Sequence, residues 1–140
     1  MGSGIEDLEI LKEAEQLADE VWELTKGWDR MPRDVVGLQL ARAADSIGAN
    51  IAEAFGRYHY PDKIRILYYA RGSLFETRYW LNRADSRKLL PQEAAPVYQA
   101  RLVDLGRRLN AFVRRLRTQA AGRKAQSDRQ SLTANPPRRP

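Results

Sequence analysis

Apolar residues recur at spacings of three and four in four separate parts of the chain, which predicts four amphipathic helices. These helices are expected over about residues 5–26, 33–58, 61–85 and 92–118. The last has the cleanest pattern, because its apolar positions share one side of the helix and arginines occupy the other. No segment shows the two-residue alternation of a strand. Long helices joined by short connections indicate an all-α fold, an antiparallel up-down-up-down four-helix bundle.

The second helix carries three different surfaces between residues 42 and 57, whereas an ordinary surface helix has one apolar and one solvated face. The apolar surface consists of Ala43, Ile47, Ile51, Ala54 and Phe55. A small-residue surface consists of Ala41, Gly48, Ala49, Ala52 and Gly56. A polar ladder consists of Arg42, Ser46, Asn50, Glu53 and Arg57. We therefore expect this helix to pack inside the bundle and also against another body, such as a second subunit.

The polar ladder has two interpretations. The favoured one is a structural hydrogen-bond network with Arg71 and Glu76 of the third helix, because a buried arginine needs a carboxylate partner. The other is a functional groove. Glu53 and Glu76 could also be cast as an acid and base pair, but no nucleophile, metal cluster or glycine-rich loop accompanies them. The sequence therefore predicts a protein that is not an enzyme.

The composition limits the classes of site further. With no cysteine and a single histidine, the 140-residue chain has no thiolate or multi-histidine metal site, and no cofactor is expected. The length predicts one domain at residues 5–119, between a flexible leader at residues 1–4 and a disordered basic tail at residues 120–140. Neither a signal peptide nor a membrane span is visible, so a soluble, cytoplasmic protein is expected.

The turn between the second and third helices holds the histidine, His59, between Tyr58 and Tyr60. The favoured interpretation is an exposed, structural turn. The alternative is an RNA-stacking cluster, because aromatic rings accept unstacked bases on their faces.

Charge is unevenly distributed along the chain, whose net charge is +6. The first helix is acidic, with eight acids against two lysines in residues 5–27. The fourth helix and the tail are basic, and arginine is suited to bidentate contact with phosphate. The candidate nucleic-acid-binding residues are Arg101, Arg107, Arg108, Arg114, Arg115, Arg117, Arg123 and Lys124. An equally open alternative is a solvated face, or one that pairs with the acidic first helix of the same or an adjacent subunit.

Two long blocks and one short block of the chain resemble a known family. The blocks are residues 8–10 (LEI), 40–57 (LARAADSIGANIAEAFGR) and 67–77 (LYYARGSLFET). Their order and spacing are similar, over most of residues 5–117, to the four-helix bundle proteins encoded in intervening sequences of bacterial 23S ribosomal RNA genes, often labelled S23 ribosomal protein. The chain departs from the family pattern at Gly48 and Ala54, where the family usually has proline and glycine. The tail after Thr118 lies outside the resemblance.

The resemblance implies a four-helix bundle that assembles as a ring-shaped homopentamer. It also implies kinship with the accessory variability determinant of diversity-generating retroelements, a basic, barrel-shaped pentamer that binds nucleic acid and a reverse transcriptase. We therefore expect a non-enzymatic, oligomeric nucleic-acid-binding or scaffold protein whose arginine-rich helix contacts RNA or DNA phosphates. The alternative is an accessory adaptor that binds a reverse transcriptase.

Overall fold

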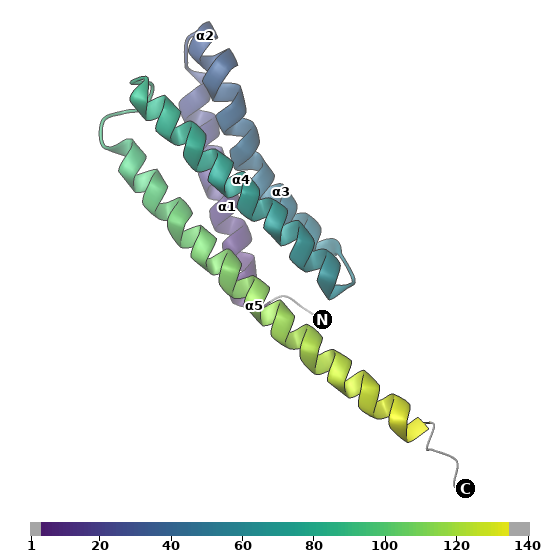
Figure 1. The fold of residues 1–140 in the computed structure, drawn as a ribbon. Helices are drawn as coiled ribbons and strands as arrows, with labels where there is room; N and C mark the ends of the chain where they lie inside the picture. The colour runs from purple at the N-terminus through teal and green to yellow at the C-terminus, as the bar shows by residue number, and fades with distance from the viewer. Residues whose placement is uncertain (1–3, 135–140) are drawn as a thin grey trace, which may run out of the picture.

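The computed structural model of the chain describes residues 4–134. Its helices are α1 (Ile5–Lys26), α2 (Arg30–Pro32), the π-helical turn η1 (Arg33–Gly37), α3 (Leu38–Gly56), α4 (Tyr60–Ser86) and α5 (Ala94–Ala134). No strand occurs among these described residues. The four long helices alternate in direction along the chain, and α5 continues past the bundle (Figure 1). The predicted all-α, up-down-up-down four-helix bundle is confirmed.

The helix ends follow local chemistry. Asp7 in the first turn of α1 accepts a hydrogen bond from the backbone N–H of Gly4 at 3.1 Å, which satisfies a donor that the helix leaves free. Gly27 caps the end of α1, as its sequence position suggests. Pro61 lies in the first turn of α4, where its missing N–H costs nothing. The π-helical turn was not predicted, because apolar spacing over five residues does not distinguish it from an α-helix.

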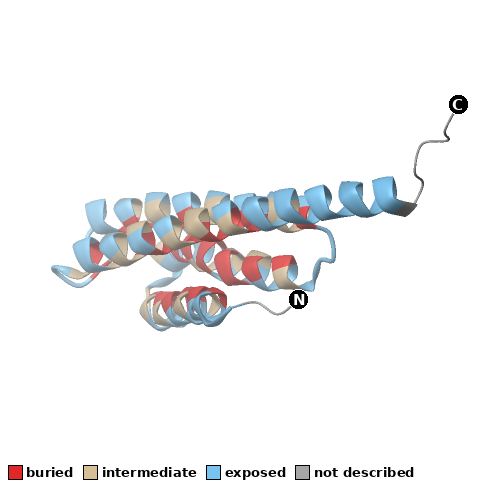
Figure 2. Ribbon diagram, turned by 90° about the horizontal axis from the view of Figure 1, so that it is seen from below, coloured by how far each residue is buried: buried red, intermediate tan, exposed pale blue. Residues whose placement is uncertain are grey.

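The core lies between α1, α3, α4 and α5, which surround it in that order, so that α5 closes the bundle against α1 (Figure 1). The buried positions of all four helices lie on the sides that face the other helices (Figure 2). The largest fully buried ones are Ile10, Val21, Leu40, Ile47, Ile51, Ile66, Leu67, Leu74, Leu81, Leu102, Leu105 and Leu109. Burying each such side chain contributes about 1.5–3 kcal/mol, so the apolar stripes account for the association of the helices.

The small-residue surface of α3 is only partly used inside the chain. Gly48 is buried against α1, where Ala14 and Leu11 are its neighbours. Ala49 and Ala52, by contrast, remain exposed. Part of this surface therefore packs against α1 within the bundle, whereas Ala49 and Ala52 are open in the single chain, and contact of α3 with a second body stays a prediction.

The structure corrects the expected disordered tail. Helix α5 continues through residues 120–134, although residues 121–133 are all exposed (Figure 2). The stretch is rich in alanine, glutamine, arginine and lysine, which favour helix, and a helix already nucleated in the bundle propagates at little cost. Apolar periodicity could not reveal this extension because it buries nothing. Residues 1–3 of the expected leader and residues 135–140 of the expected tail lie outside the described residues.

Candidate nucleic-acid interface

Arg101, a predicted phosphate ligand, is committed to the acidic helix α1. Its Nε donates to Oε1 of Glu13 at 3.1 Å, and its Nη1 donates to Oε1 of Glu20 at 3.0 Å. Its guanidinium carbon also lies 5.7 Å from the ring centroid of Tyr98. The hydrogen bond to Glu20, followed by the one to Glu13, raises the pKa of Arg101. Burial and the charge of Glu20 likewise raise the pKa of Tyr98. A guanidinium held between two carboxylates has little capacity left for a phosphate.

Arg115 is held in the same way at the other end of α1. Its Nη2 donates to Oδ1 of Asp7 at 2.5 Å, and its Nη1 lies 3.7 Å from Oε2 of Glu6. Asp7 is only 8% exposed, so this pair is partly removed from water. Arg108, between them, lies 3.9 Å from Asp104 of its own helix. Arg101 and Arg115 therefore pair with the acidic helix of the same subunit, as one of the two alternatives for this face predicts, and their assignment to phosphate stays a prediction that these ion pairs disfavour.

A heptad signal in the sequence could have revealed these pairs. Arg101, Arg108 and Arg115 are spaced by seven residues, and so are Glu6, Glu13 and Glu20 on the antiparallel helix α1. Seven residues are close to two helical turns, so each set lies along one edge of its apolar stripe. Charges at the edges of apolar stripes pair between neighbouring helices, as in coiled coils.

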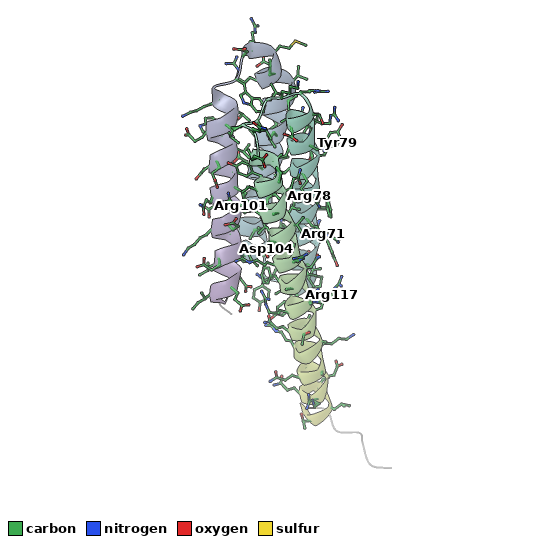
Figure 3. The ribbon with its side chains drawn as sticks, turned by 90° about the vertical axis from the view of Figure 1, so that its left-hand side faces the viewer. Arg71, Arg78, Tyr79, Arg101, Asp104 and Arg117 are labelled. Carbon is green, nitrogen blue, oxygen red and sulfur yellow. The ribbon has the colours of Figure 1, made fainter. Side chains whose placement is uncertain are left out.

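The other candidate cations remain on the surface of α5. They are Arg107, Arg114, Arg117, Arg123 and Lys124, all of them exposed. Within the described residues, none of the five lies within ion-pair distance of a carboxylate. Arg117 donates a hydrogen bond to the hydroxyl of Tyr68 and lies over its ring. Arg101 and Asp104 lie on the α1 side of α5, whereas Arg117 lies towards α4 (Figure 3).

Helix α4 adds arginines that were not assigned to this interface. The Nε of Arg78 donates to Oε1 of Gln99 at 3.0 Å, and Nε2 of Gln99 donates to the carbonyl of Arg78 at 2.9 Å. Arg71 lies one heptad earlier on the same side of α4, with its guanidinium carbon 5.5 Å from the ring centroid of Phe75 (Figure 3). The surface shared by α4 and α5 is thus rich in arginine and exposed aromatic rings.

The polar ladder of α3 forms bonds within its own helix. Ser46 donates to the carbonyl of Arg42 at 2.8 Å, and Asn50 donates to the carbonyl of Ser46 at 2.9 Å. Arg57 donates a hydrogen bond to the carboxylate of Glu53 at 2.6 Å on the exposed surface, and this hydrogen bond raises the pKa of Arg57. The ladder therefore needs no second helix to satisfy these groups.

The predicted network between this ladder and α4 is not formed among residues 4–134. Arg71 stacks on Phe75 of its own helix, and no hydrogen bond or ion pair within the described residues involves its guanidinium. Glu76 is exposed, and no hydrogen bond or ion pair within this part of the chain involves it. Each predicted residue is present on the surface, but α3 and α4 do not bring them together.

In the part of the chain that the structure describes, no group of three or more His, Cys, Asp or Glu side chains is placed to hold a metal ion. None of the helices described is both long enough and apolar enough to pass through a bilayer.

Comparison with known proteins identifies a family and a similar solved structure. Residues 6–111 match the family of the 23S rRNA-intervening sequence protein. A solved structure described as a protein with unknown function from the S23 ribosomal protein family of Bacteroides thetaiotaomicron VPI-5482 is similar, with a TM-score of 0.71 and 23% identity. The similarity covers 79% of this chain and 99% of that one, and at this identity it shows the fold. No functionally curated protein matches the chain.

Proposed function

The chain belongs to the 23S rRNA-intervening sequence protein family, and from that premise we propose that it is a non-enzymatic cytoplasmic scaffold that holds RNA or DNA by its phosphates. The observation that carries the proposal is the set of five exposed cations on α5 that have no carboxylate partner in the described residues: Arg107, Arg114, Arg117, Arg123 and Lys124. Their guanidinium and ammonium groups are free to donate to phosphate oxygens.

The geometry of α5 suits a polyanion better than a small anion. Positions 107 and 124 are separated by about 26 Å along a helix that rises 1.5 Å per residue. Arg107, Arg114, Arg117 and Lys124 fall within about 100° of the helix circumference and form an extended row rather than a pocket, whereas Arg123 lies on the side that meets Tyr58. A row of this kind follows a phosphate backbone, and it carries no base-specific information.

Binding measured across salt concentrations tests this proposal. Fluorescence anisotropy of a labelled RNA and a labelled DNA should show affinity that falls steeply with salt, because each neutralised phosphate releases counterions. The double variant Arg107→Glu with Arg114→Glu should lower the affinity for the RNA and for the DNA by at least about tenfold. Arg30→Glu, at the opposite end of the bundle, is the matched control. Absence of binding to either nucleic acid at low salt would overturn the proposal.

The same proposal includes self-association, for which the family resemblance implies a homopentamer. A shallow groove of about 340 Å³ between α1 and α3 is lined by small residues that include Ala18, Ala49 and Ala52. Asp19 and Asp45 are acids in its lining, and burial and the charge of Asp19 raise the pKa of Asp45. Contact between this groove and a different surface of the next copy would be heterologous, the kind of contact that closes into rings.

Helix α4 offers the complementary surface for that contact. Its exposed rings, among them Tyr69, Phe75 and Tyr79, stand beside arginines. Rings would enter the small-residue groove while arginines meet its acids. The native mass, measured by light scattering, should be a multiple of the chain mass, and Ala52→Arg should reduce it to one chain. A wild-type protein that is monomeric at micromolar concentration would contradict the assembly.

A second candidate function is an adaptor for a protein partner, with a reverse transcriptase as the partner of choice. It is favoured by an apolar groove of about 300 Å³ at the α2 end of the bundle, which is lined in part by Trp22 and Leu38. Trp22 and Leu38 are 57% and 45% exposed, and Val35 of the adjacent π-helical turn is 50% exposed. Exposed apolar surface of this kind marks interaction sites.

Co-purification with and without nuclease separates the two functions. Association with a reverse transcriptase that survives nuclease and is lost in Leu38→Asp favours the adaptor. Association that nuclease abolishes favours the nucleic-acid scaffold, because RNA or DNA then bridges the two proteins.

A further inference from the structure

The turn between α3 and α4 meets α5 at the point where α5 leaves the bundle. Tyr58 in this turn is 74% exposed, and its ring stands edge-to-face against His59 at a centroid distance of 5.0 Å. The guanidinium carbon of Arg123 lies 5.9 Å from the centroid of Tyr58 and 5.8 Å from that of Tyr60. Tyr60 is buried, so it anchors the cluster while Tyr58 remains open to solvent.

The charged groups of Arg123 and Lys124 are available to a ligand. Within residues 4–134, Arg123 takes part in no ion pair or hydrogen bond, and its recorded contacts are with the two tyrosine rings. Lys124 follows directly and is likewise exposed and unpaired in this part of the chain. An accessible aromatic face thus lies beside cationic donors, which are the two groups needed to hold a base and its phosphate.

We propose that Tyr58, Arg123 and Lys124 bind one unpaired nucleotide of a single-stranded RNA or DNA, with the ring of His59 supporting Tyr58 edge-to-face. The base stacks on the open face of Tyr58, and the adjoining phosphate accepts hydrogen bonds from Arg123 and Lys124. This inference rests on the proposed nucleic-acid function and adds to it a preference for single strands. In a duplex both faces of each base are covered by stacking, so only an unpaired base reaches the ring.

The site is an addition to the shared bundle. Arg123 and Lys124 lie beyond residue 111, where the family match ends. They reach the turn because α5 remains helical past the bundle. The competing explanation for the cluster is mechanical: the rings hold Arg123 and thereby fix the direction of the α5 extension. The two explanations differ in whether the cluster distinguishes single strands from duplexes.

The test compares a single-stranded RNA carrying one 2-aminopurine with the same strand in a duplex. Stacking of 2-aminopurine on a protein ring quenches its fluorescence, and anisotropy on the same samples reports affinity. The proteins are wild type, Tyr58→Leu, Tyr58→Phe and Arg107→Glu, each checked for its melting temperature. Tyr58→Phe keeps the ring, and Arg107→Glu changes the electrostatic row without touching the turn.

The proposal expects Tyr58→Leu to lower single-strand affinity about tenfold and to abolish quenching, with duplex affinity nearly unchanged. Tyr58→Phe should behave as wild type, and Arg107→Glu should lower the affinity for the single strand and for the duplex equally. Unchanged single-strand affinity in Tyr58→Leu overturns the stacking site, as does an equal loss for both ligands, which is the result expected of the mechanical role. If wild-type protein binds neither the single strand nor the duplex, the proposed nucleic-acid function is overturned, and the stacking site is overturned with it.

Discussion

The Nη2 atom of Arg101 on α5 lies 2.7 Å from Oε2 of Glu20 on α1, and its Nε bonds to Glu13, seven residues earlier on the same helix. This contact ties the last helix of the bundle to the first. Arg115 makes the equivalent contact with Asp7 near the other end of α1. The seam between α1 and α5 is therefore closed at two separated points by arginines that reach acids on the facing helix.

Replacing Arg101 should destabilise the bundle. Arg101→Met leaves Glu13 and Glu20 without their cation at a site where the arginine is only about a quarter exposed. Leaving buried carboxylates without their cation costs about 3–5 kcal/mol. Because this site is partly exposed, the expected loss in the free energy of unfolding is about 2 kcal/mol. Urea denaturation followed by circular dichroism measures the loss. Arg107→Met, on the exposed side of the same helix, is the control and should change the free energy of unfolding by less than about 0.5 kcal/mol.

Asp45→Asn should stabilise the protein at neutral pH. Burial and then the charge of Asp19 raise the pKa of Asp45 above its ordinary value of 3.8. The folded protein thus binds the proton of Asp45 more tightly than the unfolded chain does. The contribution of this proton to stability is therefore full below pH 3.8, and it is lost as the pH rises through the pKa of Asp45 in the folded protein. Because Asp45 is largely exposed, the gain should be no more than about 0.5 kcal/mol.

The difference in stability between wild type and Asp45→Asn is measured as a function of pH. Thermal melts of wild type and Asp45→Asn should separate near neutral pH and converge in acid, below the ordinary pKa of the carboxyl. Asp128→Asn, on the exposed α5 extension, removes the same charge and should leave the melting temperature unchanged. A destabilised Asp45→Asn protein at neutral pH would contradict the argument.

Gly48→Ala should also stabilise the bundle, although Gly48 is buried. A Cβ at this position would lie 3.7 Å from Cβ of Ala14, which is an ordinary van der Waals contact. Alanine gains about 1 kcal/mol over glycine inside a helix, so the free energy of unfolding should rise by up to that amount. At Gly37 a Cβ would lie only 3.3 Å from the ring of Trp28, so Gly37→Ala should gain less or lose stability. Denaturant titrations of the two variants should therefore rank Gly48→Ala above Gly37→Ala, and the reverse order would count against this packing.

Removing the α5 extension should separate stability from binding. A chain ending at Ala120 keeps the last residue of α5 that packs against the core, so its melting temperature should stay within a few degrees of wild type, while far-ultraviolet circular dichroism should lose the helical signal of the removed segment. Nucleic-acid affinity should fall because Arg123 and Lys124 are removed. Ser131→Pro interrupts the extension beyond Arg123 and Lys124 without removing a charge, so it should lower helicity with little effect on those two cations. Truncation that leaves the helical signal per chain unchanged would show that the extension is not helical in solution.

The fold and its core were predictable because local spacing contains the necessary information. Apolar residues that recur with the period of a helix must share a face, and helices with one apolar face must bury it. The four long helices and the buried positions of α5, such as Leu105 and Leu109, follow from this rule. The family also follows from sequence, since the two long blocks that resemble it fall on α3 and α4.

The arrangement of the helices in space decides which arginines of α5 pair with acids and which remain unpaired. Arg107 and Arg108 are adjacent in sequence, yet a rotation of about 100° per residue places Arg108 towards the α1 side and leaves Arg107 exposed. Which side of α5 meets acids is set by the helix that closes against it, and that is a property of the packed bundle. The helical extension is a similar case, because its stability comes from the bundle that precedes it. Sequence spacing specifies which face of a helix is buried, whereas the neighbour across that face decides whether a charged side chain there is paired or free to bind a ligand.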